Sequence, residues 1–260
     1  MERGWVGQLM ATWHLFCLST RRLIWTRQTM ISLFLYAFAA VGVLAWSRRF
    51  SGESPERFIE QIFLGLYGAI LLPIICLSYG TAGIASDREE KTLVYLLVSP
   101  LPRPLVFIAK SAASLTLAML WALGGLGLFC LLGRGAGMNA WPYVWSSVIW
   151  STVAYVMLYL LFSVTVRRAT VLAMAHALFL ETLVGSLPGI AKRWSISFYF
   201  RSLILDRCEN LNLRLEGAMR RDLFKAITGE QAQLALLAIT TVLFLTSLAI
   251  FSRREYTSGS

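Results

Sequence analysis

Long stretches without charge alternate with short charged clusters along this chain. Five stretches of at least 18 residues contain no Asp, Glu, Lys or Arg, and they run over 29–46, 61–86, 111–133, 138–166 and 231–252. A hydrocarbon core about 30 Å thick is crossed by about 20 helical residues. Each stretch is therefore long enough to cross a membrane as one helix. We expect Pro73 to kink the second helix.

A sixth stretch, 169–191, is apolar except for Glu181 and His176, and its length also fits one crossing. We therefore expect an all-α, polytopic membrane protein with six transmembrane helices in a single transmembrane domain over 1–260. The expected spans are about 29–46, 61–86, 105–133, 138–166, 169–191 and 231–252. Three glycines in the third span are expected to permit close helix contact, namely Gly124, Gly125 and Gly127.

The first 28 residues have no continuous apolar stretch and no small-residue cleavage site, so they do not match a signal peptide. Their apolar residues recur at helical steps of three, four and seven, at Trp5, Leu9, Trp13, Phe16 and Leu23. This spacing predicts an amphipathic helix over 1–28 that lies in the membrane interface. A disordered tail is the alternative.

The composition agrees with a lipid environment, since 57% of the residues are apolar and 15% are charged. Soluble domains average about 45–50% apolar and about 25% charged residues, which argues against a soluble protein. The net charge is +10, but the basic residues cluster at the ends of the apolar stretches, as at Arg48, Arg49, Arg253 and Arg254. At those positions they would contact lipid headgroups, so the charge does not require a nucleic-acid partner.

Four cysteines, Cys17, Cys76, Cys130 and Cys208, lie far apart without CxxC or C-x-H spacing. The sequence therefore indicates neither a disulfide framework nor a metal site.

Six spans place both termini on the same side of the membrane. Each side then holds twelve Lys and Arg residues, but eight of the outer twelve fall in the long segment 192–230. Long segments translocate largely regardless of their charge, and without this segment the count is twelve against four. We therefore expect both termini in the cytoplasm.

The segment between the second and third spans has a distinct pattern. Residues 87–91 are all charged, and Leu93, Leu96 and Leu97 then form one apolar helical face. Acidic residues favour a helix start, and three prolines within 100–104 oppose further helix. The pattern predicts a short amphipathic helix at the membrane face. From the residues alone, it is either an ordinary interfacial loop helix or a docking element.

This segment and the next span share one pattern: Arg-Glu-x-x-Thr-Leu-x-x-Leu-Leu-x-Ser-Pro, followed about ten residues later by a Lys. The residues that form it are Arg88, Glu89, Thr92, Leu93, Leu96, Leu97, Ser99, Pro100 and Lys110. The pattern resembles the signature of ABC-2-type permeases, the membrane subunits of one class of ABC exporters. The amphipathic N-terminus, six spans, inner termini and an external helical segment between spans five and six are also similar to that family's layout. Val94 departs from the pattern, because the family often has a second Glu there, which leaves the charge pairing with a partner open.

The resemblance implies that residues from about 88 to 98 form a coupling helix that seats in a groove of a cytoplasmic ABC ATPase subunit. The implied coupling residues are Arg88, Glu89, Glu90, Thr92, Leu93, Leu96, Leu97, Ser99 and Pro100. It also implies a dimer of transmembrane domains in the cell (cytoplasmic/inner) membrane, formed with a second copy or a paralogue. ATP and Mg²⁺ would be bound by the ATPase, since this chain has no G-x-x-x-x-G-K-[ST] loop and we expect no cofactor and no catalytic residue in it.

Glu181 is the most costly residue to insert, because an acidic group near the centre of a span costs about 2.5–3.5 kcal/mol. It either lines the transport pathway, or reaches water or pairs with Arg193. His176 lies five residues earlier, about 140° around the helix, so the two side chains do not share a face. A packing role is the simpler interpretation of His176, with a pathway role as the alternative.

Between the fifth and sixth spans, apolar residues recur every four positions from Leu211 to Ile227, and Gly229 follows as a C-cap. This pattern predicts an external amphipathic helix, with a solvated loop as the alternative.

We therefore expect a permease subunit of an ATP-driven ABC transporter that exports or translocates an undetermined substrate with a separate ATPase. A non-transporting membrane anchor or assembly factor with the same layout is the second interpretation. A membrane-embedded enzyme is the third. Such an enzyme needs two or three polar groups converging at one depth, whereas the spans offer Glu181 and His176 without an HExxH or GxSxG motif.

Overall fold

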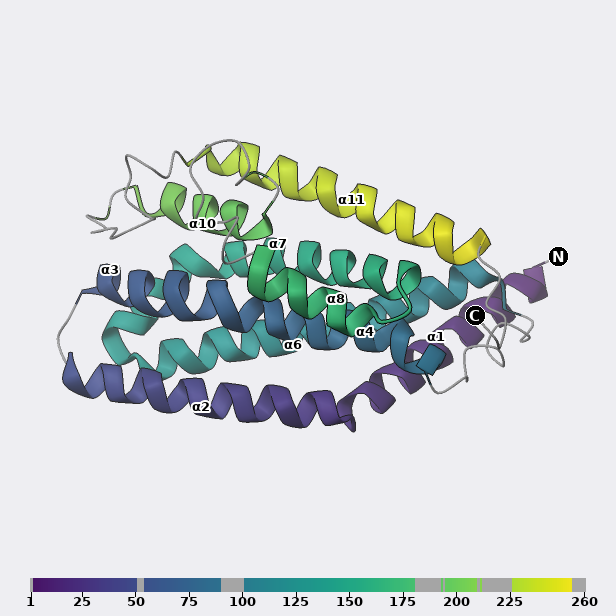
Figure 1. Cartoon of the computed structure of the whole chain (residues 1–260), viewed down its shortest axis with the longest axis horizontal. Helices are drawn as coiled ribbons and strands as arrows, with labels where there is room; N and C mark the ends of the chain where they lie inside the picture. The colour runs from purple at the N-terminus through teal and green to yellow at the C-terminus, as the bar shows by residue number, and fades with distance from the viewer. Residues whose placement is uncertain are drawn as a thin grey trace.

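The computed structural model describes residues 2–50, 54–89, 101–180, 193, 195–209, 211 and 226–253. Over these ranges it contains helices and no strand, in agreement with the all-α prediction. The elements are α1 (Glu2–Ile24), α2 (Arg27–Arg49), α3 (Pro55–Phe58), the π-helix η1 (Ile59–Leu71), α4 (Leu72–Glu89), α6 (Arg103–Leu132), α7 (Arg134–Thr165), α8 (Ala169–Ala175), the π-helix η2 (His176–Leu180), α10 (Ile196–Arg207) and α11 (Gly229–Arg253). Figure 1 shows the long helices side by side along one axis, with α1 running obliquely to the start of α2.

Five helices are long and apolar enough to cross a membrane, and they coincide with five of the predicted spans. They are α2, the continuous helix Pro55–Arg88 that comprises α3, η1 and most of α4, and then α6, α7 and α11. The fifth predicted span, 169–191, is described over α8 and η2, while residues 181–191 lie outside the described part of the chain. The count of six spans therefore stays a prediction.

The second span is longer than its uncharged stretch, because the helix already begins at Pro55, where proline suits the first turn. Thirteen residues, Ile59–Leu71, then form a π-helix, and the Leu72 N–H donates to the Tyr67 carbonyl five residues earlier. Pro73 follows directly. Proline has no N–H and its ring clashes with the carbonyl of a preceding α-helical turn, so the wide π turns provide room for it.

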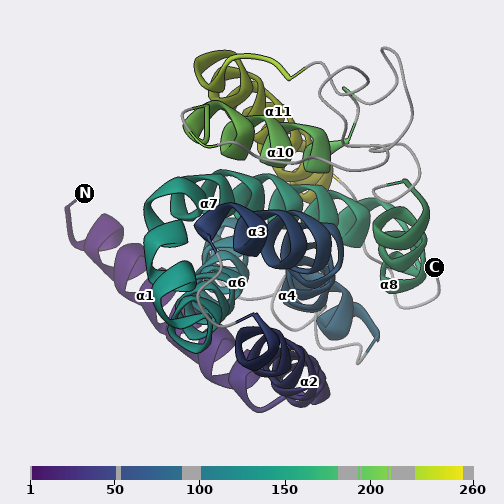
Figure 2. The ribbon, with the colours of Figure 1, turned by 90° about the vertical axis from the view of Figure 1, so that its left-hand side faces the viewer.

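α7 lies at the centre of the bundle and packs against α4, α6, α10 and α11 (Figure 2). Small residues bring α4 close to it, since a Cβ atom on Gly80 would lie 2.8 Å from Tyr159 Cβ and 3.3 Å from the Val156 carbonyl oxygen. At the same contact, Ser163 Oγ donates to the Thr81 carbonyl at 3.0 Å. Close approach through small residues and hydrogen bonds between helices are typical of packing in a membrane.

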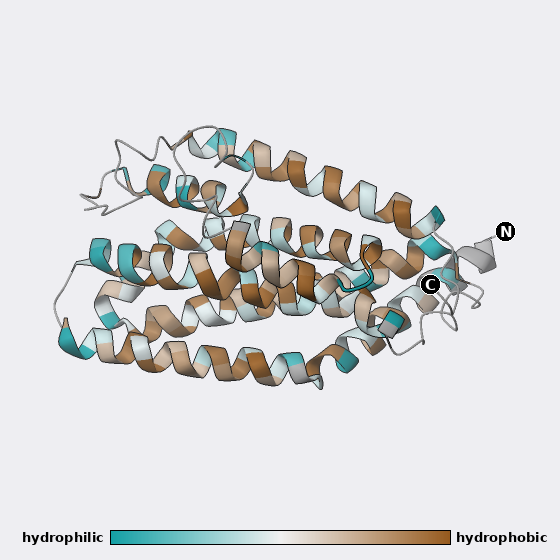
Figure 3. Ribbon diagram, in the orientation of Figure 1, coloured by the Kyte–Doolittle hydropathy of each residue, from teal (hydrophilic) through white to brown (hydrophobic). Residues whose placement is uncertain are grey.

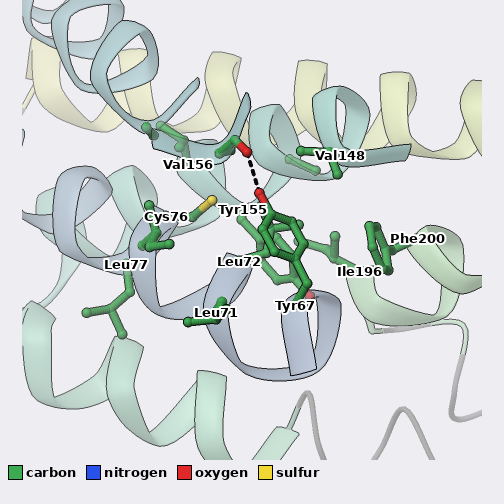
Figure 4. Close-up of a cluster of buried hydrophobic side chains, with 14 of the residues drawn as sticks. Tyr67, Leu71, Leu72, Cys76, Leu77, Val148, Tyr155, Val156, Ile196 and Phe200 are labelled. Atoms are coloured by element: carbon green, nitrogen blue, oxygen red, sulfur yellow. Dashed lines mark hydrogen bonds between the residues drawn. The ribbon is translucent and has the colours of Figure 1, made fainter. Parts of the chain in front are cut away.

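A series of aromatic rings connects η1 with α2 and α6. Tyr67 contacts Phe63 and Phe129 edge-on at centroid distances of 5.7 and 5.8 Å, and Phe129 contacts Tyr36 at 5.9 Å. The Tyr36 hydroxyl also donates to the Trp121 carbonyl at 2.8 Å. Figure 4 shows Tyr67 among the buried side chains contributed by η1, α4, α7 and α10. Such ring pairs contribute about 0.5–1.5 kcal/mol each beyond the burial of area.

Of the three glycines expected to permit close helix contact, the structure gives this role to Gly125. A Cβ atom on Gly125 would overlap the Tyr36 ring, whereas no atom of the described residues lies within 4 Å of one on Gly124. A Cβ atom on Gly127 would make an ordinary contact with Trp141 at 3.9 Å. The expectation is therefore wrong for Gly124 and Gly127, because these two residues do not face a neighbouring helix closely.

Apolar side chains cover the outward faces of the first and last spans. On α2 they include the exposed Phe34 and Phe38, and on α11 the exposed Leu234 and Val242. Figure 3 shows hydrophobic residues along the length of the helices and hydrophilic residues mainly at their ends. This distribution suits a bundle surrounded by lipid, because hydrocarbon tails solvate apolar but not charged side chains.

The predicted N-terminal helix is present as α1, which excludes a disordered tail over Glu2–Ile24. Its location in the membrane interface stays a prediction. The N-terminus, the C-terminal end of α11 and the helix ends that border segment 90–100 all lie at one end of the bundle (Figure 1). We call this the terminal end. The start of α1 and the end of α11 thus lie at the same end of the bundle.

The helix predicted between Leu211 and Ile227 is wrong at its C-terminal boundary. Gly229 opens α11 instead of capping a preceding helix, and the Ala232 N–H donates to the Thr228 carbonyl at 2.9 Å. Thr228 thus occupies an N-cap position, which favours threonine, and Glu230 suits the first turn electrostatically. Residues 212–225 lie outside the described part of the chain. A different helix, α10, precedes them and is packed on α7 and α11.

Candidate functional site

Three charged side chains meet at the terminal end, where the second span ends and the third begins. Asp87, in the last turn of α4, has one carboxylate oxygen on the Lys110 ammonium group and the other 2.6 Å from a guanidinium nitrogen of Arg22. Asp87 and Lys110 are 3% and 4% exposed, and the Arg22 side chain is 46% exposed. We call these three residues the charge cluster; it joins α1, α4 and α6.

The backbone positions of Asp87 and Lys110 explain why they pair. Asp87 lies two residues before the end of α4, and Lys110 lies two turns into α6, which runs back beside α4. The two helices approach so closely here that a Cβ atom on Gly83 would overlap Ser114 Oγ. Lys110 Nζ also donates to the Gly83 carbonyl at 3.5 Å. Removing one partner of such a buried pair costs about 3–5 kcal/mol, because the other charge is then left uncompensated.

Two further contacts connect these helix ends to the rest of the bundle. The Arg88 guanidinium donates to the Val166 carbonyl at the end of α7. The Arg103 guanidinium, at the start of α6, donates to the Ser252 carbonyl near the end of α11 at 3.5 Å. Together with the charge cluster, these contacts link both borders of segment 90–100 to α1, α7 and α11.

The residues predicted to contact an ATPase fall mostly on segment 90–100. Seven of them lie outside the described residues: Glu90, Thr92, Leu93, Leu96, Leu97, Ser99 and Pro100. For Glu89, the structure describes the helical backbone. Residues 87–89 form the last turn of α4 and do not open a new helix. An acidic residue is unfavourable at a helix C-terminus, but Lys110 and Arg22 compensate the Asp87 charge there.

His176 lies at the start of η2 against α7, edge-on to both Tyr159 and Phe162, with ring centroids 5.9 and 5.7 Å away. This position supports the packing interpretation. Glu181 lies outside the described residues, and Arg193 is exposed. A pathway role for Glu181 and His176 therefore stays a prediction.

Sequence reasoning used Lys110 as part of a motif but missed its pairing with Asp87 and Arg22. A signal was present, because Lys110 is a lone charge within the predicted span 105–133 and Asp87 directly follows the uncharged stretch 61–86. Ionisable residues at membrane depth usually pair with one another. What the sequence did not supply was the closeness of α4 and α6, on which the pairing depends.

Among the described residues, no group of three or more His, Cys, Asp or Glu side chains could hold a metal ion. The four cysteines are free thiols, with Cys17 exposed and Cys76, Cys130 and Cys208 buried. The charge cluster holds oppositely charged groups paired with each other, an arrangement suited to joining helices rather than to acid–base or nucleophilic chemistry.

The family model described as ABC-2 family transporter protein matches residues 18–187, about two thirds of the chain. The chain belongs to the ABC-2 transporter family. The match includes all three residues of the charge cluster, segment 90–100 and the helices from α2 to η2. As an ABC-2 family member, the chain is a membrane component of a transporter and not itself a catalytic domain. No curated protein matches the chain.

Proposed function

We propose that this ABC-2 family protein is the permease subunit of an ATP-driven exporter in the cytoplasmic membrane, working with a separate ATPase subunit and a second transmembrane domain. Family membership supports the permease assignment. The observation that carries the coupling proposal is the set of contacts between helix ends around segment 90–100: Asp87 with Lys110 and Arg22, Arg88 with Val166, and Arg103 with Ser252.

These contacts suggest how a movement of segment 90–100 would reach the bundle. The Asp87–Lys110 pair makes the ends of α4 and α6 move together, and Arg22 adds the end of α1. The Arg88 and Arg103 contacts extend the movement to α7 and α11. An ATPase bound to the segment would therefore act on several spans at once, as in a rigid-body transition between inward and outward access. ATP chemistry takes place in the ATPase, since this chain has no phosphate loop.

The test is reversal of charge in the predicted coupling segment, by Glu89→Arg together with Glu90→Arg in a chain co-expressed with the ABC ATPase that we expect the neighbouring gene to encode. We expect loss of co-purification and at least tenfold lower vanadate-sensitive ATPase turnover in proteoliposomes, because like charges repel at a docking surface. The control reverses two exposed acidic residues outside this segment, Glu209→Arg with Glu230→Arg.

The control variant is expected to keep both association and turnover. If the segment variant also keeps both, the ATPase does not bind there and the coupling proposal is wrong. If the segment variant still binds the ATPase but loses turnover, the ATPase does not depend on these two charges for binding. That result would contradict docking at Glu89 and Glu90.

A further inference from the structure

Two glycines of the third span, Gly124 and Gly127, are not explained by packing against the described residues. Both lie within the α-helix α6, where glycine is a poor helix former and alanine the best one. No atom of the described residues lies within 4 Å of a Cβ atom on Gly124. One on Gly127 would make an ordinary contact with Trp141 at 3.9 Å. Alanine would therefore fit at both positions, so the distinctive effect of glycine there is a weaker helix.

The neighbouring Gly125 has a different role, because it lets the Tyr36 side chain reach the backbone of α6. A Cβ atom on Gly125 would overlap the Tyr36 ring. The Tyr36 hydroxyl donates to the Trp121 carbonyl at 2.8 Å, and the Tyr67 hydroxyl donates to the next carbonyl, that of Ala122. Two buried tyrosines, one from α2 and one from η1, thus donate to consecutive carbonyls of a third helix, just before the glycines.

The same two carbonyls accept the helical hydrogen bonds that cross the glycines. In an α-helix the Trp121 carbonyl accepts from the Gly125 N–H, and the Ala122 carbonyl accepts from the Leu126 N–H. A carbonyl oxygen has two lone pairs, so it accepts a hydroxyl as well. Bending α6 at the glycines would open these helical bonds, and an unpaired carbonyl in a membrane is costly. With the tyrosine hydroxyls in place, each carbonyl keeps a donor, while the N–H groups can shift to a neighbouring carbonyl through 3₁₀ or π turns.

The glycines also separate two parts of α6 that have different attachments. Towards the terminal end, Lys110 pairs with Asp87 of α4, and Arg103 donates to a carbonyl of α11. Beyond the glycines, α6 lies so close to α7 that a Cβ atom on Gly137 would overlap the Cys130 carbonyl. A bend between these two parts would let the terminal half of α6 move with α4 and α11, while the other half stays on α7.

We propose that α6 has a hinge at residues 124–127 and that the Tyr36 and Tyr67 hydroxyls lower the free energy of opening it. In the straight helix the hydroxyls are second donors to the Trp121 and Ala122 carbonyls. In the bent helix they are the donors that remain. The hinge is a property of this chain alone and does not require the ATPase.

The test measures amide hydrogen exchange by mass spectrometry in the purified full chain in lipid nanodiscs, over the peptide that covers 121–130. Gly124→Ala combined with Gly127→Ala is expected to slow exchange there about tenfold, after correction for intrinsic rates, because alanine stiffens the helix. The unfolding temperature should not fall. The matched control is Gly42→Ala on α2, an exposed glycine that also has no atom of the described residues within 4 Å of its Cβ position. The control should leave exchange over 121–130 unchanged, and equal exchange in the wild type and the double variant would overturn the hinge.

A second variant separates the role of the hydroxyls from simple packing. Tyr36→Phe combined with Tyr67→Phe keeps both rings and removes the two donors, so we expect exchange over 121–130 to slow about fivefold. If the hydroxyls only fasten α2 and η1 to α6, the same variant loosens the contact and exchange becomes faster. Unchanged or faster exchange would therefore overturn their role. The control is Tyr79→Phe, which removes a buried hydroxyl that donates to Thr29 Oγ1 instead of a carbonyl of α6. Equal slowing by this control would also overturn that role.

Discussion

Lys110 and Asp87 are buried together, so each compensates the charge of the other. Lys110→Met keeps the length of the side chain but leaves the Asp87 carboxylate without its buried partner. We expect a loss of about 3–5 kcal/mol in the free energy of unfolding. Equilibrium unfolding of the purified chain in mixed micelles measures it. Asp87→Asn combined with Lys110→Met should recover part of the loss, whereas the exposed Arg168→Met should change little. A stable Lys110→Met chain would show that the pair does not hold α4 and α6.

Two cysteines outside the spans differ in their access to solvent. Cys17 on α1 is exposed, whereas burial, with a smaller effect of the Glu56 charge, raises the pKa of the Cys208 thiol to about 12. A raised pKa disfavours the reactive thiolate, so at pH 8 about one Cys208 thiol in ten thousand is ionised. We expect N-ethylmaleimide to modify Cys17 at pH 7 and at pH 9, and Cys208 at neither, as read by peptide mass spectrometry. Unfolding should make both react. Native alkylation of Cys208 at the rate of Cys17 would contradict the packing of α10.

Residue types were predictable from the sequence, but most of their partners were not. The pattern around 88–100 indicated the family, which the family model then showed. Asp87, Lys110 and Arg22 come from three helices, and Asp87 and Arg22 are 65 positions apart along the chain. Their contact follows from the close approach at Gly83 and Ser114, which no local pattern encodes.

At the scale of elements, two neighbouring glycines of α6 provide a matched comparison. A Cβ atom on Gly125 would displace the Tyr36 ring, which also donates to the Trp121 carbonyl, whereas Gly124 has open space. Gly125→Ala is therefore expected to lower the free energy of unfolding by about 1–3 kcal/mol through overpacking between α2 and α6. Gly124→Ala should be neutral or stabilising by up to about 1 kcal/mol, because alanine favours the helix. Thermal unfolding in detergent measures both. Equal effects would contradict the close contact.

The spans themselves were the most predictable elements, because hydrophobic length alone determines whether a helix can cross the membrane. Their boundaries were less so. The second span gains a turn from Pro55 and a π-helix before Pro73, and both depend on backbone hydrogen bonds that hydropathy does not report. Gly229 was misassigned as a helix end, although Thr228 before it and Glu230 after it together indicate a helix start.

For the whole molecule, the orientation in the membrane is the property on which coupling depends. Both termini and the borders of segment 90–100 share the terminal end, so one labelled position in that segment decides the side of all of them. We expect that Tyr95→Cys, in a chain whose native cysteines are replaced by serine, is not modified by a membrane-impermeant maleimide in intact cells. It should react after the membrane is opened.

The control for this labelling is Gly135→Cys, an exposed position with open space at the junction of α6 and α7, at the opposite end of the bundle. It should react from outside in intact cells. The reverse result for the two positions would place segment 90–100 outside the cell, out of reach of any cytoplasmic ATPase. The Asp87–Lys110 pair would then still join α4 to α6, since its contacts do not depend on the direction of insertion. Orientation and bundle packing are thus separable, and this labelling tests the orientation alone.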